Sequence, residues 1–298
     1  MSEAPKGYQR NMLLSPEDKM PEGMQRIAAV VEYDGSAFCG WQRQSHSPSV
    51  QAEVERALSK VAAEPITVAC AGRTDTGVHG TNQVIHFDTL AQREARNWIL
   101  GANANLPDSI RVHWASPVSP QFHARFSATA RTYRYVISNQ PYRPALGHSG
   151  LTWQRLPLDE KAMQQGANYL LGERDFSSFR GAGCQSKTPN RNMHYVDVWR
   201  QGELVIIELR ANAFVLHMCR NIAGALIAVG AGEKKPEWID ELMAVRDRNQ
   251  AGITAPPQGL YLVNVSYPAE FEFPQLPPGP HCVAEPLRRL PCEHRIPL

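Results

Sequence analysis

Apolar residues along the first half of the chain recur with the periods of helices and strands. Behind Ser49, a favourable N-terminal cap, an apolar stripe at helical spacing predicts a helix. The stripe consists of Val50, Val54, Ala57, Leu58 and Val61. The other predicted elements are, in chain order, a strand in RIAAVVEYDG (26–35), buried strands in ITVACA (66–71) and QVIHFDT (83–89), a helix at 92–104 and a strand in RVHWAS (111–116).

The second half repeats a similar order of elements, although no literal sequence repeat is visible. Its elements are a strand in RTYRYVIS (131–138), a helix at 159–171, a hairpin in HYVDVWRQGELVIIELRAN (194–212) that turns at Gln201 and Gly202, a helix at about 214–229, a shorter helix from Pro236 and a strand in GLYLVNVSY (259–267). This order predicts an α+β fold of two pseudo-symmetric halves, in which an antiparallel or mixed sheet is flanked by helices.

The two ends of the chain lack such periodicity. Residues 1–24 mix Pro, Gly, Met and charge, and residues 273–298 contain PQLPPGP without a core pattern, so we expect both to be tails. Between them we expect an N-terminal half at 25–120 and a C-terminal half at 121–272. The proline-containing segment 115–121 is the expected junction.

The composition is that of an ordinary folded protein. Of 298 residues, 43% are hydrophobic and 20% are charged, and the net charge of +2 shows no overall basic excess. No apolar run approaches the roughly 20 residues of a membrane span, so we expect a soluble protein. Six cysteines without a CxxC pair or a secretory leader favour reduced thiols in the cytoplasm. His281–Cys282 and Cys292–His294 could form a metal clip, but the Pro-rich segment between them is weakly patterned, and we expect no metal site.

Basic residues gather locally in two stretches that contain no acid. The first stretch lies between Asp108 and Asp159, and its densest part, FHARFSATARTYRY (122–135), mixes arginines with the aromatic rings that phosphate contact and base stacking require. Its arginines are Arg111, Arg125, Arg131, Arg134, Arg143 and Arg155. The second stretch, 177–196, carries Arg180, Lys187 and Arg191. The alternative is that both are solvated surface strips.

A glycine-punctuated loop, AGRTDTGVHG (71–80), offers a single carboxylate, Asp75, beside Arg73. The loop leaves one predicted strand and enters another, which places Asp75 at the rim of a sheet. Gly72 and Gly77 allow the close approach of a large ligand. An acid held between two turns is a candidate nucleophile. The alternative is an Asx-turn residue that bonds its own backbone, with the arginine as a solvated neighbour.

The apolar helix predicted at 214–229 carries Arg220 in its middle. An arginine there either reaches out to water or meets an acid, because burying it unpaired is costly. Tyr133, Leu260 and Trp41 also allow two interpretations. Each is either an ordinary packing residue or the wall of a site for a base.

The motifs, in their order along residues 26–267, resemble the TruA family of tRNA pseudouridine synthases. The matching motifs are YDG, GWQRQ, SVQ, GRTDTGVHG, FHARFSA, YRY, HMCRNI and GLYL. The resemblance implies the pseudouridine synthase fold. It also implies that the protein isomerises uridine to pseudouridine at positions 38, 39 and 40 of the anticodon stem-loop of tRNA, without a cofactor and as a homodimer.

The resemblance further implies roles for individual residues. Asp75 is the nucleophile and Arg220 its partner, while Tyr133 and Leu260 lie against the target base and Arg73 steers it. The residues implied to contact tRNA are Arg93, Phe122, His123, Ala124, Arg125, Phe126, Gly183, Cys184, Gln185, Ser186 and Lys187.

Two other interpretations stay open at this point. The arginine and aromatic strip suits an RNA-binding module without catalysis, and Asp75 suits a glycoside or nucleoside hydrolase. A glycosidase ordinarily places two carboxylates around the bond, whereas this loop offers one. The order of motifs favours the isomerase.

Overall fold

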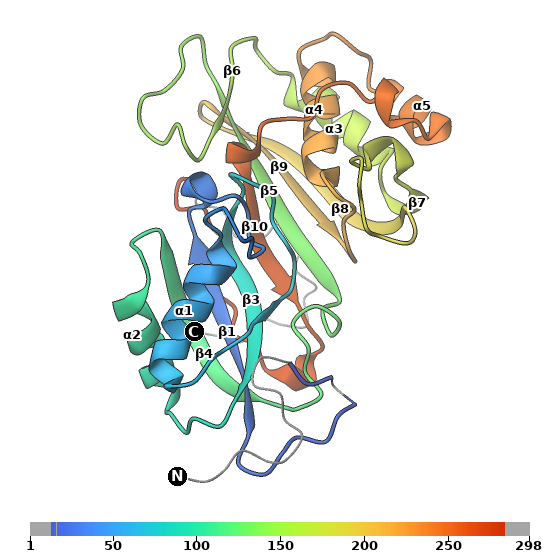
Figure 1. Ribbon diagram of the computed structural model, residues 1–298. Coiled ribbons are helices and arrows are strands. Elements are labelled where there is room, and N and C mark those ends of the chain that lie inside the picture. Colours follow the sequence, from blue (N-terminus) through green and yellow to red (C-terminus); the bar gives the residue numbers. More distant parts are fainter. Residues whose placement is uncertain (1–12, 16, 284–298) are drawn as a thin grey trace.

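The computed structural model describes residues 13–15 and 17–283, which form a mixed, ten-stranded sheet with its α-helices on one face (Figure 1). Eight strands follow the order β4-β1-β3-β10-β5-β9-β8-β7, with β2 beside β3 and β6 beside β5. The predicted α+β class is confirmed. Residues 1–12 and 284–298 of the two predicted tails lie outside the described residues.

The elements have the following bounds. The strands are β1 (Gln25–Tyr33), β2 (Ala69–Cys70), β3 (His79–Thr89), β4 (Ile110–Val118), β5 (Ala130–Asn139), β6 (Thr152–Gln154), β7 (Gly172–Asp175), β8 (Asn190–Gln201), β9 (Leu204–Ala211) and β10 (Leu260–Ser266). The α-helices are α1 (Val50–Ala62), α2 (Ala95–Asn105), α3 (Glu160–Asn168), α4 (Met218–Gly230) and α5 (Trp238–Val245).

The two halves of the chain repeat one strand order. In the first half β1 lies between β4 and β3, and in the second half β5 lies between β10 and β9, with antiparallel pairing throughout. The halves join where β3 and β10 pair in parallel, with Tyr261 opposite His79 and Leu262 opposite Gly80. This junction brings the loop before β3 next to β10 and β5, although these segments are far apart in the sequence.

The strand predicted at 66–71 is much shorter in the structure, where only Ala69 and Cys70 pair with β3. Side chains of α1 accept hydrogen bonds from the backbone N–H groups of the residues just before Ala69. The N–H of Ile66 donates to Ser59 Oγ, and the N–H of Val68 donates to a carboxylate oxygen of Glu55. Local side-chain acceptors therefore replace the expected strand partner.

Helix α1 begins where the sequence predicts. Ser49 has extended backbone angles and its hydroxyl accepts from the N–H of Ala52, as an N-cap does. Val54 and Leu58 of the predicted stripe are buried against β1 and β3. Burial of a side chain of this size is worth about 1.5–3 kcal/mol, so the stripe fixes the helix on the sheet.

The helix predicted from Phe214 begins four residues later, at Met218. His217 adopts left-handed backbone angles, with φ 60° and ψ 4°, and interrupts the helical path. The left-handed region costs a residue other than glycine about 1–2 kcal/mol. This conformation determines where the His217 side chain points, as described below.

The other helices and the hairpin follow the sequence more closely. The helix predicted at 159–171 ends at Asn168, and the polar segment GERD then forms β7, which the sequence pattern did not predict. The hairpin of β8 and β9 turns at Gly202, with φ 57°, as expected.

Two helical layers cover the same face of the sheet (Figure 1). Helices α1 and α2 close a core over the first half around Ile27, Phe87 and Trp98. Helices α3, α4 and α5 close a larger core over the second half around Ile207 and Leu226. Between these layers the sheet is left open, and the loop 71–80 lies there.

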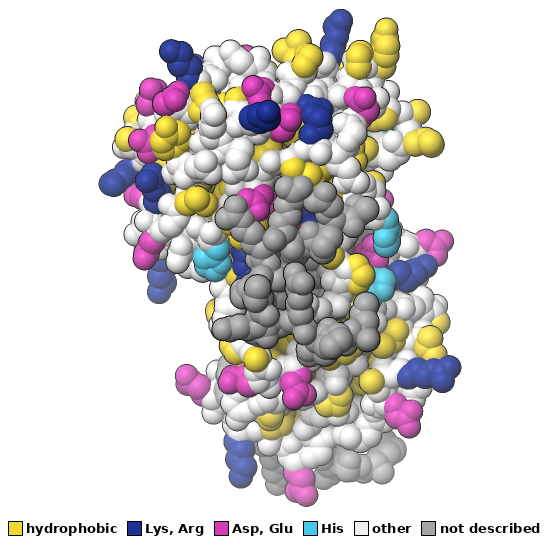
Figure 2. All heavy atoms as spheres, turned by 180° about the vertical axis from the view of Figure 1, so that it is seen from behind, with side chains coloured by type: hydrophobic (Ala, Val, Ile, Leu, Met, Phe, Trp, Pro, Cys, Tyr) yellow, Lys and Arg dark blue, Asp and Glu magenta, His cyan; other side chains and the backbone are white. Residues whose placement is uncertain are grey.

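The described part of the predicted C-terminal tail packs on the reverse face. Phe273 stacks on Tyr267 and lies 5.1 Å from Phe122, ring centre to ring centre. Thr81 Oγ1 donates to the carbonyl of Pro278, which ties the segment to β3. Figure 2 shows this face, where Lys and Arg side chains lie apart from one another and do not form one patch.

Candidate active site

A cleft of about 870 Å³ opens between the two helical layers. One wall is the loop from Ala71 to Thr76, and the other is the segment 213–220 at the start of α4. Tyr133 of β5 and Leu260 of β10 also line it. Residues from both halves of the chain therefore meet around one space.

The backbone of the loop is fixed from two sides. The carbonyl of Thr74 accepts from the N–H of Trp41, and the hydroxyls of Thr74 and Tyr33 lie 2.8 Å apart. Gly40 has φ 89°, and a Cβ there would lie 2.8 Å from the Thr74 oxygen, so only glycine lets the two segments approach this closely. Trp41 is 1% exposed, which makes it a packing residue.

Asp75 lies beside an arginine and a histidine in the cleft. Its Oδ2 is 3.5 Å from Nη1 of Arg220 and 3.5 Å from Nε2 of His217. The Asp75 side chain is 26% exposed and that of Arg220 is 15% exposed, so solvent screens the pair only in part. The structure brings together the carboxylate and the arginine that the sequence singles out.

Arg220 is held in place by the segment after α5. Its Nε donates to the carbonyl of Ala255, and the N–H of Ala255 donates back to the carbonyl of Arg220. Thr254 is fixed in turn, because its hydroxyl and Arg248 both donate to the buried Oδ1 of Asn221. The guanidinium therefore meets Asp75 in an orientation that the fold determines.

Gly224 allows this segment to reach α4, and Gly224→Ala is expected to destabilise the protein. A Cβ at Gly224 would lie 2.0 Å from the carbonyl oxygen of Ile253. Alanine gains about 1 kcal/mol of helix propensity over glycine, but forced overpacking costs about 1–3 kcal/mol. We therefore expect a lower melting temperature and, because the Ala255 carbonyl must move, a lower activity.

The matched control for Gly224→Ala is Gly230→Ala in the same helix. There the nearest atom to a Cβ is the Sδ of Met163, at 2.6 Å, and a thioether side chain can move aside. Thermal unfolding of the two variants compares them directly. A Gly224→Ala protein as stable as the Gly230→Ala protein would contradict the proposed crowding.

Tyr133 and Leu260 form an apolar floor beside Asp75. They are 8% and 5% exposed, and the ring of Phe214 meets Tyr133 edge to face at 5.1 Å. Burial raises the pKa of Tyr133 well above its ordinary value, so its hydroxyl stays protonated at neutral pH. A Cβ at Gly72 would lie 3.4 Å from that hydroxyl oxygen, which shows how closely the loop approaches it.

Two arginines of the first acid-free stretch serve the fold. Arg131 is 9% exposed and donates to the carbonyls of Ala71, Arg125, Ala128 and Asn212. Burial lowers its pKa, and these carbonyls replace its water. Arg134 is fully buried and bonds Glu208 at 2.7 Å. The sequence near these two arginines contains no acid and gave no sign of these partners, because the partners lie on other strands and loops.

The segment from Phe122 to Phe126 divides into buried and exposed positions. Phe122 and Ala124 have no exposed surface, and Arg26 donates to the carbonyl of Phe122. Phe126 is 72% exposed, and the guanidinium of Arg125 lies over its ring at 5.6 Å. His123, Arg125 and Phe126 line the cleft, so these three side chains can meet a ligand there.

The second predicted contact segment forms the far rim of the cleft. Gly183, Cys184, Gln185 and Ser186 line it, while Lys187 is exposed outside the lining. Arg180 donates to the carbonyls of Cys184 and Ser186. Burial alone would raise the pKa of the Cys184 thiol, but hydrogen bonds from the backbone N–H groups of Leu216 and Ser186, together with Arg180, outweigh it and lower that pKa.

Two further predicted arginines are exposed. Arg73 lines the cleft next to Asp75 and bonds no other described side chain or backbone group. Arg93 lies between β3 and α2, outside the cleft lining, and donates to the carbonyl of Gln92.

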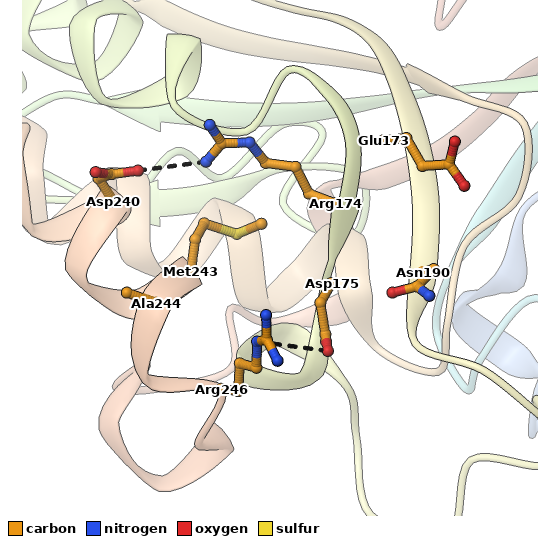
Figure 3. Close-up of a pocket in the computed structure, with 8 residues that line it drawn as sticks. All are labelled: Glu173, Arg174, Asp175, Asn190, Asp240, Met243, Ala244 and Arg246. Atoms are coloured by element: carbon orange, nitrogen blue, oxygen red, sulfur yellow. Dashed lines mark hydrogen bonds and ion pairs between the residues drawn. The ribbon is translucent and has the colours of Figure 1, made fainter.

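A second cavity, of about 620 Å³, lies between β7 and α5 (Figure 3). Four of its five charged side chains form two pairs, Arg174 with Asp240 at 3.3 Å and Arg246 with Asp175 at 3.6 Å. None of the predicted site residues lines it.

The described part of the chain was expected to hold neither a metal site nor a membrane-spanning helix. No group of three or more His, Cys, Asp or Glu side chains there could hold a metal ion. Cys282 of the considered metal clip is exposed, while Cys292 and His294 lie outside the described residues. The five described cysteines are free thiols. Across residues 13–15 and 17–283, every helix is too short or too polar to cross a bilayer.

The chain is similar to known tRNA-modifying proteins over most of its length. Residues 29–127 and 167–268 match the family described as tRNA pseudouridine synthase. The chain is 55% identical over 257 residues to tRNA pseudouridine synthase A of Coxiella burnetii, which covers 86% of this chain and 98% of that protein. It is 57% identical over 255 residues to the protein of that name from Vibrio cholerae (86% and 97%) and 56% identical over 255 residues to that from Shewanella woodyi (86% and 98%).

Proposed function

The chain belongs to the tRNA pseudouridine synthase family, and from this premise we propose that it isomerises uridine to pseudouridine at positions 38, 39 and 40 of the anticodon stem-loop of tRNA, with Asp75 as the nucleophile. One observation supports the assignment of Asp75 above the others. It is the only carboxylate among the residues that line the cleft, all of which are described. A hydrolase with two carboxylates around the bond does not fit this lining.

The reaction breaks the bond between the sugar and N1 of uracil and forms a bond between the same sugar carbon and C5. C5 gives up its proton and N1 takes one up, so the product has the same composition as the substrate. Asp75 attacks the sugar or the ring, or removes a proton so that a glycal forms. Its Oδ2 lies 3.5 Å from Nη1 of Arg220 and 3.5 Å from Nε2 of His217, which suits a carboxylate held in one orientation for any of these steps.

The floor of the cleft suits a uracil that has to stay while its bond is exchanged. Tyr133 offers a protonated hydroxyl and Leu260 an apolar surface. Together they hold the detached ring and leave little room for water, which would otherwise capture the sugar.

The target nucleotide has to leave its stack to reach Asp75, at a cost of a few kcal/mol. Arg73 lies at the cleft wall with its side chain exposed, which suits a role in steering the flipped base. The cleft lining carries five arginines against one acid, a balance that attracts the phosphates of an RNA stem. RNA helices are bound mainly through backbone and shape, which suits several neighbouring target positions.

Phe126→Ala is expected to weaken tRNA binding by about tenfold, since the stacking of one base on an aromatic ring is worth about 1–3 kcal/mol. The ring is 72% exposed, so the melting temperature should stay unchanged. Tyr142→Ala is the control, because Tyr142 is 85% exposed and lies outside the cleft lining. Filter binding with an anticodon-arm RNA measures both affinities. Equal affinities of the two variants would remove Phe126 from the contact surface.

Carbodiimide labelling of anticodon-arm uridines before and after incubation with the protein tests the proposed activity. Pseudouridine retains the label and has the mass of uridine. Conversion of uridines at positions 38 to 40 is the expected result. Salt-dependent tRNA binding without conversion would instead indicate an RNA-binding module without catalysis, and release of free uracil would indicate a hydrolase.

The remaining family traits are also carried to this chain as proposals. We infer a homodimer that acts in the cytoplasm and binds one tRNA across both subunits. Light scattering of the purified protein, alone and with tRNA, gives the two masses that test this assembly.

A further inference from the structure

We propose that His217 is a positioning residue that, together with Arg220, fixes the orientation of the Asp75 carboxylate. The inference rests on the proposed role of Asp75 as the nucleophile. The two side chains reach the same oxygen, Oδ2, each at 3.5 Å. Two side chains that contact one oxygen from different directions restrict the rotation of the carboxylate more than a single contact does.

The backbone of His217 is arranged to allow this contact. Its left-handed conformation, φ 60°, precedes the first residue of α4, Met218, and turns the imidazole out of the helix toward the loop 71–80. Left-handed residues other than glycine are uncommon, and they gather at functional sites. In a continuous helix His217 would lie one turn from Asn221 on the same face and would not need this conformation.

Gly181 provides the space for the ring. A Cβ at Gly181 would lie 2.9 Å from Nδ1 of His217 and 3.1 Å from the carbonyl oxygen of Leu216. The N–H of Gly181 donates to that carbonyl at 2.7 Å, so the two segments cannot separate easily. The imidazole is thus held between a glycine backbone and the carboxylate, and its 36% exposed side chain still borders the cleft.

The role assigned to His217 predicts a defect in the chemical step alone. A small error in the position of a reacting group can lower a rate by about 100-fold without loss of binding. A residue that served only folding would change the stability instead, and a residue that served only RNA contact would change the affinity.

Three substitutions separate these effects. His217→Asn keeps a residue type that tolerates left-handed angles, but its side chain is too short to reach Asp75. His217→Gln places an amide N–H near the position of Nε2. Gly181→Ala leaves the histidine present and displaces its ring. Ala182→Ser is the control, since Ala182 is exposed and outside the cleft lining.

Single-turnover pseudouridine formation, the dissociation constant for tRNA and thermal unfolding are measured for each variant beside the wild type and Asp75→Asn. We expect His217→Asn to lower the single-turnover rate by about 10- to 100-fold with affinity unchanged within about twofold. His217→Gln should recover most of the rate, and Gly181→Ala should fall between them.

A His217→Asn protein with the wild-type rate, or with a normal rate and weakened tRNA affinity, would overturn the proposal. So would a defect shared equally by the Gln and Asn variants. Failure of the proposed function has a different signature, because then the wild type forms no pseudouridine or Asp75→Asn still forms it.

Discussion

Asp75→Asn is expected to abolish pseudouridine formation in a protein that still folds and binds tRNA. The substitution keeps the size of the side chain and removes the ionised oxygen that reacts. Loss of a catalytic nucleophile commonly lowers the rate by about 10⁴-fold or more. Arg220 remains bonded to the carbonyl of Ala255, so the cleft keeps its shape.

The measurement is single-turnover conversion of an anticodon-arm RNA, scored by carbodiimide labelling, with binding and thermal unfolding measured in parallel. Asp108→Asn is the matched control, because the Asp108 side chain is fully exposed and pairs with Arg111 outside the cleft lining. The control should keep the wild-type rate. Conversion by Asp75→Asn at a rate near that of the control would remove Asp75 from the mechanism.

The sequence predicts the elements well where local signals agree. Ser49 and the stripe behind it define α1, and Gly202 defines the hairpin turn, because the cap, the period and the turn residue act over a few neighbouring positions. The sequence overestimates the strand at 66–71, since its backbone bonds are taken by Ser59 and Glu55 of α1. The parallel pairing of β3 with β10 could not be read from a pattern either, because it depends on segments about 180 residues apart.

The pairing of Asp75 with Arg220 was expected only from the family resemblance. Taken alone, the acid also suits an Asx turn, and the arginine also suits a side chain that reaches out to water. The structure places the two side chains 3.5 Å apart. His217 lies 3.5 Å from the same oxygen, but the sequence does not single it out, because its left-handed backbone falls within a predicted helix. The absence of nearby acids in the sequence also gave a wrong picture of Arg131 and Arg134. Both arginines are buried, and their partners lie on other strands and loops.

Arg220→Ala is expected to lower the rate of pseudouridine formation by about 100- to 1000-fold and to destabilise the fold by about 1–3 kcal/mol. The two losses have separate causes. The stability loss comes mainly from the Ala255 carbonyl, which loses its donor, and the rate loss comes from Asp75, which is left with His217 alone. A surface ion pair would give much less, but Arg220 is only 15% exposed.

Arg220→Lys separates charge from geometry. Lysine keeps the positive charge near Asp75, but one ammonium group cannot reproduce a planar guanidinium that bonds Ala255 through Nε and faces Asp75 through Nη1. We expect its rate to fall between those of Arg220→Ala and the wild type. Single-turnover kinetics and urea unfolding of both variants give the two effects. A variant without arginine that keeps normal rate and stability would count against the pairing.

Combining Arg220→Ala with Asp75→Asn shows how much of the stability effect passes through the pair. If Arg220 stabilises the fold only through Ala255, the loss in the double variant equals that of Arg220→Ala added to that of Asp75→Asn. If the ion pair also contributes, the double variant loses less than this sum, because neither partner is then left unpaired in the cleft. Since the contact with Ala255 is a hydrogen bond of 2.8 Å and the contact with Asp75 is 3.5 Å long, we expect a small coupling in stability. The larger effect of Arg220 should then lie in the reaction, where the orientation of Asp75 matters most.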